Sequence, residues 1–193
     1  MVVMRDQVVR ALAALEVKGN EDGLIPAFGV LVNQLPTTFW NTFSERMMDA
    51  AEDGKKQEVE KALVNCAYEC GYHTGYGIIN SEEFKSVVEP MVTEGEKDVL
   101  RGAYAVFTAW GWAKSGVVQL KPGERMVIRA QDYYEQDSGG SGKRAFMIQG
   151  VSSAFFELAY ADPYPDGMNT YTCSQTAGIE DGDSFGEFVV EHK

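Results

Sequence analysis

The N-terminal third of the chain places apolar residues with the period of an α-helix, interrupted once by a proline-containing stretch. Residues 2–17 predict a short amphipathic helix. Residues 20–38, which contain Pro26 and Pro36, predict an irregular connector with buried apolar side chains. A second helix is expected from about residue 37. Its inner face should carry the aromatic residues Phe39, Trp40 and Phe43.

Helical spacing continues through the middle of the chain. A break is expected near Gly54, after which a long helix resumes and ends at about Tyr76. Ser81 is followed by two acidic residues, which suit the positive end of a helix dipole, and so predicts a helix start. That helix should end before Pro90. A further helix is predicted over residues 94–112. Its inward-facing residues should be Val99, Ala103, Val106, Phe107 and Trp110.

After residue 116 the hydrophobic period changes from that of a helix to that of a strand. Residues 117–120 and 126–131 flank a turn with Pro and Gly at its centre, which predicts a β-hairpin. The remaining predicted elements are a flexible loop (137–142), a helix (144–160) and two strands (170–176 and 185–191). Because no βαβ alternation appears, this order indicates an α+β domain in which helices back an antiparallel sheet.

Composition narrows the class of partner. The chain has 193 residues, 45% of them hydrophobic, and can bury a sizeable core. Its formal net charge of -12 argues against nucleic acid or an anionic membrane, since Lys and Arg carry phosphate binding. No apolar run approaches the roughly 18 residues that a spanning helix needs. Three cysteines, with no secretory signal pattern, favour free thiols in a cytoplasmic protein.

The segment 66–77 concentrates reactive side chains. On a helix, Cys66, Cys70 and His73 share one face, and Glu69 can meet His73 one turn away. These groups could form a metal site, an acid/base pair or a nucleophilic site. The alternative is that both thiols are buried in a packed helix face, with Glu69 and His73 as an ion pair. A metal site would need further soft ligands, for which only Cys173 and His192 remain, so packing is favoured.

Aromatic residues stand beside glycines along the chain, and missing side chains can leave room for a ligand. From the residues alone, a pocket and a plain core explain this pattern equally well. The candidate ligand-binding residues are Tyr68, Tyr72, His73, Tyr76, Phe107, Trp110 and Phe146.

Three blocks of sequence carry a resemblance to a known family. They are residues 68–75, with Gly-Tyr followed by a glycine three residues later; residues 110–112 leading into the hairpin; and residues 145–154 followed by the strand with Cys173. Over residues 60–191 the chain resembles the 4-vinyl-reductase domain family. Its relatives include effector-binding domains of phenol- and xylene-responsive activators and, more remotely, transport-particle subunits that hold an acyl chain. The resemblance implies a mixed domain enclosing an apolar pocket between helices and sheet.

The same resemblance implies a function. Residues 1–58 would form an N-terminal helical arm that helps to build a homodimer, and residues 59–193 a domain that binds a small hydrophobic or aromatic molecule. The protein would then be a sensor, carrier or auxiliary subunit. The rival hypothesis is a reductase or hydrolase of a small ring-containing substrate, with Glu69, Cys70 and His73 as active groups.

The chain differs from the family that it resembles at the residues of a metal site. Sensor-type members carry a structural zinc held by three cysteines and one glutamate. The matching positions here are Ala145, Thr170 and Cys173, and the acidic loop that follows offers no final cysteine. One thiol cannot form a four-coordinate zinc site. We therefore expect neither this zinc nor another cofactor.

Overall fold

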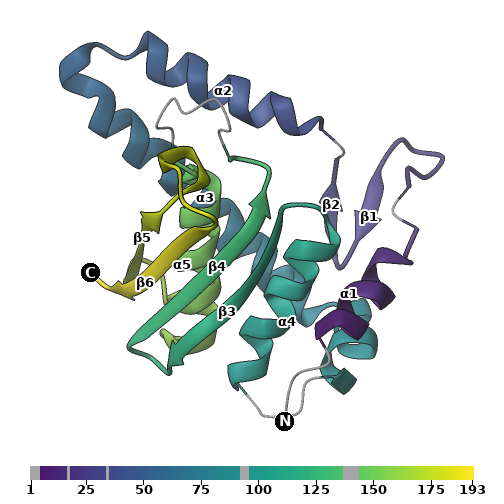
Figure 1. Ribbon diagram of the computed structural model, residues 1–193. Helices are drawn as coiled ribbons and strands as arrows, with labels where there is room; N and C mark the ends of the chain where they lie inside the picture. The colour runs from purple at the N-terminus through teal and green to yellow at the C-terminus, as the bar shows by residue number, and fades with distance from the viewer. Residues whose placement is uncertain (1–4, 17, 34, 92–95, 137–143) are drawn as a thin grey trace.

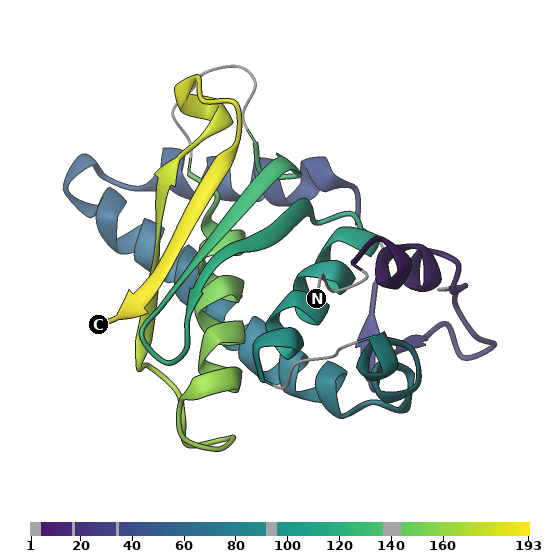
Figure 2. The same cartoon turned by 60° about the horizontal axis from the view of Figure 1, so that its bottom comes forward.

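A four-stranded antiparallel sheet with helices packed against one face forms the larger part of the fold (Figures 1 and 2). The structure is a computed structural model that describes residues 5–16, 18–33, 35–91, 96–136 and 144–193. The helices are α1 (Arg5–Ala13), α2 (Thr37–Ala50), α3 (Lys56–Asn80), α4 (Glu96–Ala109) and α5 (Phe146–Tyr160). The strands are β1 (Ile25–Ala27), β2 (Val30–Val32), β3 (Ala113–Lys121), β4 (Arg125–Tyr133), β5 (Tyr171–Ala177) and β6 (Gly186–His192). Short helical turns are η1 (Asp53–Lys55), η2 (Phe84–Val88), η3 (Glu89–Met91) and η4 (Ile179–Asp181).

The predicted α+β class is confirmed, and the large sheet contains both predicted hairpins in the order β3-β4-β6-β5. On β4, Met126 and Ile128 are fully buried, and they pair with Val190 and Phe188 on β6, which are buried as well. Alternate residues of a strand face the same side, so these four side chains form one apolar face. That face is covered by α5, which packs against β5 and β6 (Figure 1).

Glycines bring α3 and α5 into close contact. A β-carbon on Gly150 of α5 would lie 2.3 Å from the carbonyl oxygen of Val64 and 2.6 Å from the amide nitrogen of Tyr68, both on α3. A β-carbon on Gly71 of α3 would lie 3.1 Å from the α-carbon of Val151. Backbone atoms cannot move aside as a flexible side chain can. The crossing of the two helices therefore depends on glycine, above all at position 150.

The N-terminus of α5 is held by a carboxyl group from the connection that follows β4. Glu135 is buried, and its two oxygens accept hydrogen bonds from the amides of Met147 and Ile148, each at 2.9 Å. Burial raises the pKa of Glu135 to about 8; its two amide donors act in the opposite direction, and the nearby Glu180 raises it further. The carboxyl group takes the place of a capping side chain at the helix start, satisfying amides that have no partner within the helix.

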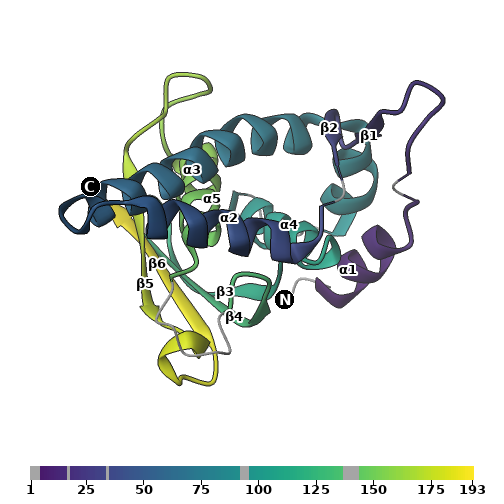
Figure 3. The ribbon, with the colours of Figure 1, turned by 90° about the horizontal axis from the view of Figure 1, so that it is seen from above.

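A second hydrophobic core joins the N-terminal segment to the middle of the chain. Val8 and Leu12 of α1 are almost fully buried, and they belong to one cluster with Phe28, Phe84 and Val106. This segment therefore contributes core residues against α4 and η2, whereas α2 extends away from this core and runs beside α3 (Figure 3). The proposed division at residue 58 stays a prediction.

The expectation of an irregular connector over residues 20–38 is wrong in one part, because β1 and β2 form a small hairpin there. The two turn residues, Phe28 and Gly29, have φ of 52° and 71°. Positive φ at both positions is the conformation that a two-residue hairpin turn requires, and a phenylalanine rarely adopts it. The ring of Phe28 is buried, and this packing offsets the backbone cost.

The predicted inner face of α2 is also corrected. Trp40 packs against the main core, but Phe39 and Phe43 are 46% and 42% exposed. Only a narrow side of α2 meets the body, where Trp40 is inserted and the Asn41 side-chain amide donates to the carbonyl of Tyr134 at 2.9 Å. The apolar spacing located a helix correctly but overestimated how much of it is covered.

Helix ends in the middle of the chain agree with the sequence in most places. α3 ends at Asn80, four residues beyond the predicted end, and the hydroxyl of the next residue, Ser81, accepts from the amide of Phe84 at 3.1 Å, as a cap does. Helical turns continue through η3, past the predicted stop at Pro90, because a proline tolerates the first turn of a short helix. The predicted loop 137–142 lies outside the described residues. No helix within the described ranges is long and apolar enough to cross a membrane.

We expect Gly150→Ala to destabilise the protein by about 1–3 kcal/mol or more, because the new methyl group collides with the α3 backbone. This loss would outweigh the roughly 1 kcal/mol by which alanine favours a helix over glycine. The matched control is Gly54→Ala, since a β-carbon there meets no atom within 4 Å. Urea denaturation measures both free energies of unfolding. Equal stability of the two variants would show that α3 and α5 can separate at little cost.

Candidate ligand-binding site

An apolar cavity of about 110 Å³ lies among α3, α4, α5 and η2. Its walls consist almost wholly of carbon, and the described residues that line it include no charged side chain. The expected pocket between α3 and the sheet therefore lies elsewhere: α5 fills the space between α3 and the strands, and the cavity opens among the helices. On the side of the sheet, Trp112, which lies just before β3, is the one described residue that lines the cavity.

The glycines of α3 shape one wall of the cavity. Gly71 and Gly75 line it from one side, opposite Phe155 and Leu158 of α5. A β-carbon on Gly75 would lie 2.8 Å from the δ-carbon of Leu158 and 3.4 Å from the Phe155 ring. The absence of side chains at these glycines therefore lets α3 and α5 meet along this side of the cavity.

Aromatic rings from α4 and the segment after it form the opposite wall. Phe107 lies 5.1 Å from Trp112 and 6.2 Å from Phe155 between ring centres, the latter pair edge to face. Trp110 completes this wall and touches Phe28 of the small hairpin from outside, edge to face at 5.2 Å. All five residues predicted to face inward from helix 94–112 line this cavity. They are Val99, Ala103, Val106, Phe107 and Trp110.

Trp110 carries the most informative polar atom of the cavity wall. Its indole nitrogen is buried and has no hydrogen-bond partner within the described structure. An indole N–H can only donate, and a buried donor without an acceptor costs about 1–3 kcal/mol. An oxygen or nitrogen acceptor on a bound molecule would remove this cost.

The thiols of α3 are placed differently from the expectation of buried, packed cysteines. Cys66 and Cys70 are both exposed, because the buried face of α3 is formed by residues such as Ala67 and Gly71. Cys70 also lines the cavity, and its sulfur lies 3.8 Å from the hydroxyl of Thr74. A free thiol therefore lies where the cavity meets solvent.

The other two candidate catalytic residues do not reach the cavity. Glu69 is exposed, and His73 is exposed with its Nδ1 3.0 Å from the hydroxyl of Tyr164. Of Glu69, Cys70 and His73, only Cys70 lines the cavity. The three side chains are not brought together around a space that could hold a substrate.

The predicted tyrosines lie on another side of α3. Tyr164 stacks on Tyr76 with ring centres 3.9 Å apart, and on Tyr72 at 5.4 Å. Tyr68 donates its hydroxyl hydrogen to the buried Glu157, and the hydroxyl oxygen accepts from the amide of Asn169 at 2.7 Å. None of these tyrosines lines the cavity, and neither does Phe146, which is buried at the start of α5.

Glu157 organises the segment that leads into β5. Its Oε1 accepts from the amides of Thr170 and Tyr171 at 2.8 and 3.0 Å, while Oε2 accepts from Tyr68. Burial raises the pKa of Tyr68, and the hydrogen bond to Glu157 raises it further. This is the arrangement of a structural network, in which every strong donor and acceptor is used.

Metal-binding potential is low among the described residues, where no group of three or more His, Cys, Asp or Glu side chains is placed to hold an ion. Cys173 is buried, and burial raises the pKa of its thiol, which disfavours the thiolate that metals bind. His192 is exposed and lies against the ring of Tyr171, with ring centres 4.5 Å apart.

Comparison with known proteins finds similarity in structure rather than in sequence. No protein-family model matches the chain, and no curated protein matches it. A crystal structure of the phenol-responsive sensory domain of the transcription activator PoxR, with phenol, has a TM-score of 0.71 at 9% identity, covering 100% of this chain and 92% of that one. A trafficking protein particle complex subunit 3 from Naegleria fowleri, covalently bound to palmitic acid, has a TM-score of 0.56 at 14% identity, covering 81% and 92%. At such identities the likeness establishes a shared fold.

Replacing Tyr68 tests whether the tyrosine side of α3 is structural. Tyr68→Phe removes one donor to Glu157 and leaves the Asn169 amide without its acceptor, so we expect a loss of about 1–3 kcal/mol in the free energy of unfolding. Ligand affinity should stay unchanged, because Tyr68 does not line the cavity. The control is Tyr76→Phe, whose side chain is 39% exposed. Weaker ligand binding by Tyr68→Phe at unchanged stability would place the binding site on this side instead.

Proposed function

We propose that the chain binds a small, uncharged, ring-containing molecule in the cavity among α3, α4 and α5, as a sensor, carrier or auxiliary subunit. The observation that carries this proposal is the almost wholly apolar cavity itself, and one of its lining residues, Trp110, has a buried indole N–H without a partner among the described residues. A buried donor that has no acceptor costs free energy. A ligand with one polar atom on an apolar body supplies that acceptor.

The size of the cavity favours a single ring. At about 110 Å³ it is comparable to the engineered apolar cavity of about 150 Å³ that takes up benzene in another protein. A long acyl chain, such as the palmitic acid covalently bound in one of the structural neighbours, needs a longer tunnel. The neighbour holding phenol offers the closer analogy in ligand size.

The chemistry of the walls favours a neutral ligand. Among the described residues of the lining, only Cys70, Thr74 and the two tryptophans have polar side-chain atoms, and none has a charge that could pair with an ionised group. Moving an unpaired carboxylate into such surroundings would cost several kcal/mol or more. Neutral molecules such as phenols and similar alcohols or ketones avoid this cost, whereas aromatic acids in their ionised form do not.

Catalysis on such a molecule has less support than binding of it. A reductase or hydrolase built on Glu69, Cys70 and His73 would need these side chains around one substrate, and only Cys70 lines the cavity. The partner of the Cys70 sulfur is the hydroxyl of Thr74, which is not a base that could activate a thiol. Binding therefore explains the geometry with fewer requirements than catalysis does.

We include self-association through α2 in the proposal. Phe39, Phe43 and Met47 are spaced four residues apart, so they form one stripe along the helix, and each is 42–46% exposed. An exposed apolar helix face that meets its own copy makes the symmetric contact of a homodimer. No DNA-binding role is proposed, because 29 acidic residues outnumber 17 Lys and Arg.

Ligand binding is tested by calorimetry with phenol and toluene, which differ by the polar atom. We expect the wild-type protein to bind phenol more tightly, and Trp110→Phe to weaken phenol binding about 2- to 10-fold while leaving toluene binding unchanged. Trp40→Phe, outside the cavity, is the matched control. Ala103→Leu should reduce binding of both ligands, because it fills the cavity. No binding of either ring compound by the folded wild-type protein would contradict the proposal.

Self-association is tested by light scattering of the double variant Phe39→Ser, Phe43→Ser. We expect the wild-type dimer to become a monomer, since both side chains are largely exposed and their loss should not disturb the core. The control is Val118→Ser, which removes a 54% exposed apolar residue from β3. Deletion of the N-terminal residues would be a less clear test of self-association, because it would also remove Val8 and Leu12 from a hydrophobic core. An unchanged mass of the double variant would exclude α2 as the dimer contact.

A further inference from the structure

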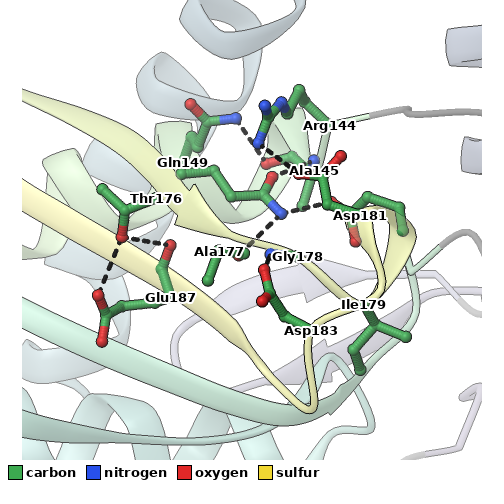
Figure 4. A network of polar contacts seen from close by, with 12 residues as sticks. Arg144, Ala145, Gln149, Thr176, Ala177, Gly178, Ile179, Asp181, Asp183 and Glu187 are labelled. Atoms are coloured by element: carbon green, nitrogen blue, oxygen red, sulfur yellow. Dashed lines mark hydrogen bonds and ion pairs between the residues drawn. The ribbon is translucent and has the colours of Figure 1, made fainter.

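The turn between β5 and β6 is joined to the rest of the fold by a buried polar network (Figure 4). Glu180, in η4, is 5% exposed, and its carboxylate accepts from the hydroxyl of Tyr133 on β4 and from the side-chain amide of Gln175 on β5. The Tyr133 hydroxyl oxygen in turn accepts from the amide of Ile179 at 3.1 Å. A single carboxylate thus connects β4, β5 and the turn.

The same network reaches the start of α5. The side-chain oxygen of Gln175 accepts from the amide of Ala145 at 2.9 Å, immediately before the helix begins, while its nitrogen donates to Glu180 and to the carbonyl of Ala177. We call the residues Tyr133, Gln175 and Glu180, with the amide of Ala145, the Glu180 clasp. Every polar atom that it buries has a partner, which is the condition under which a buried network stabilises a fold.

Weaker contacts surround the clasp. Arg144 and Asp181 form an ion pair at 3.1 Å with both side chains 39–44% exposed, and the carboxylate of Asp183 accepts from the amide of Gly178 at 3.0 Å (Figure 4). Exposed pairs of this kind contribute little, because water and salt screen them. The burial of Glu180 therefore distinguishes it from the other acidic residues of the turn.

Of the positions that the family resemblance would assign to a structural zinc, Ala145 belongs to the clasp, whereas Thr170 lies beside Glu157 near the other end of α5. Ala145 has no donor atom, and Thr170 uses its backbone amide to bind Glu157. Cys173 is the only thiol of the matching set, and its burial disfavours the thiolate form. The residues present do not fit a zinc ion.

We propose that the Glu180 clasp fastens the β5–β6 turn to the start of α5 in place of a metal ion, so that the fold and the cavity are independent of zinc. The link to the cavity runs through α5, which begins at the clasp and contributes Val151, Phe155 and Leu158 to the cavity wall. The amide of Ala145 fixes this helix at one end, and Glu135 holds the next two free amides. Loosening of the clasp would therefore loosen one wall of the cavity.

Hydrogen exchange on the full chain tests the clasp directly. In Glu180→Ala we expect the amides of Ala145 and Ile179 to exchange at least about tenfold faster than in the wild type, with a lower Tm. The matched control is Asp181→Asn, which removes only the exposed ion pair with Arg144 and should leave both amides and Tm nearly unchanged. If Glu180→Ala fails to fold, Tyr133→Phe removes one hydroxyl from the clasp, and faster exchange at Ile179 is the expected result. Unchanged exchange in the folded variants would overturn the proposal.

Metal independence is tested on the same protein. We expect purified wild type to contain no stoichiometric zinc by elemental analysis, and its Tm to be unchanged by a chelator. Stoichiometric zinc together with a Tm lowered by the chelator would overturn the proposal in favour of a metal site. These readouts do not depend on any ligand, so failure of the clasp proposal and failure of the proposed binding function can be told apart.

Discussion

The close crossing of α3 and α5 is the constraint on which the rest of the structure depends. Gly150 brings the backbones of the two helices into contact, and the space between them could not hold even one added methyl group. α3 packs on α5, α5 packs on the sheet, and the cavity lies where α3, α4 and α5 meet. One side of the cavity therefore depends on backbone contact, which is harder to change than side-chain packing.

Three buried carboxyl groups position the segments that lead into and out of α5 and the β5–β6 turn. Glu135 holds the start of α5, Glu157 near its end holds the entry to β5, and Glu180 holds the β5–β6 turn. Each is almost fully buried and receives at least two donors. Because an unpaired buried acceptor is costly, each carboxyl group fixes one arrangement of its neighbours. Loops that a disulfide or a metal would stabilise elsewhere are here positioned by hydrogen bonds.

Local periodicity was enough to predict most elements and one wall of the candidate site, but not the other walls. The five inward residues predicted for helix 94–112 line the cavity, because a helical stripe must face something apolar. The tyrosines of α3 form a similar stripe, yet their neighbours are Glu157 and Tyr164, roughly 90 residues away in sequence. The spacing of apolar residues identifies one face of a helix, but it does not identify the residues that pack against that face. The exposed aromatic residues of α2 and the turn at Phe28 were missed for the same reason.

The edge-to-face contact between Phe28 and Trp110 gives the small hairpin an importance beyond its length. Phe28 belongs to a segment of three-residue strands, yet it supports the outer side of a ring whose inner side faces the cavity. This contact restricts the Trp110 ring, so the shape of the cavity wall depends partly on a residue more than eighty positions earlier in the chain. The hairpin in turn shares its hydrophobic core with α1, through Val8 and Leu12, so the support of this ring draws on the N-terminal segment as well.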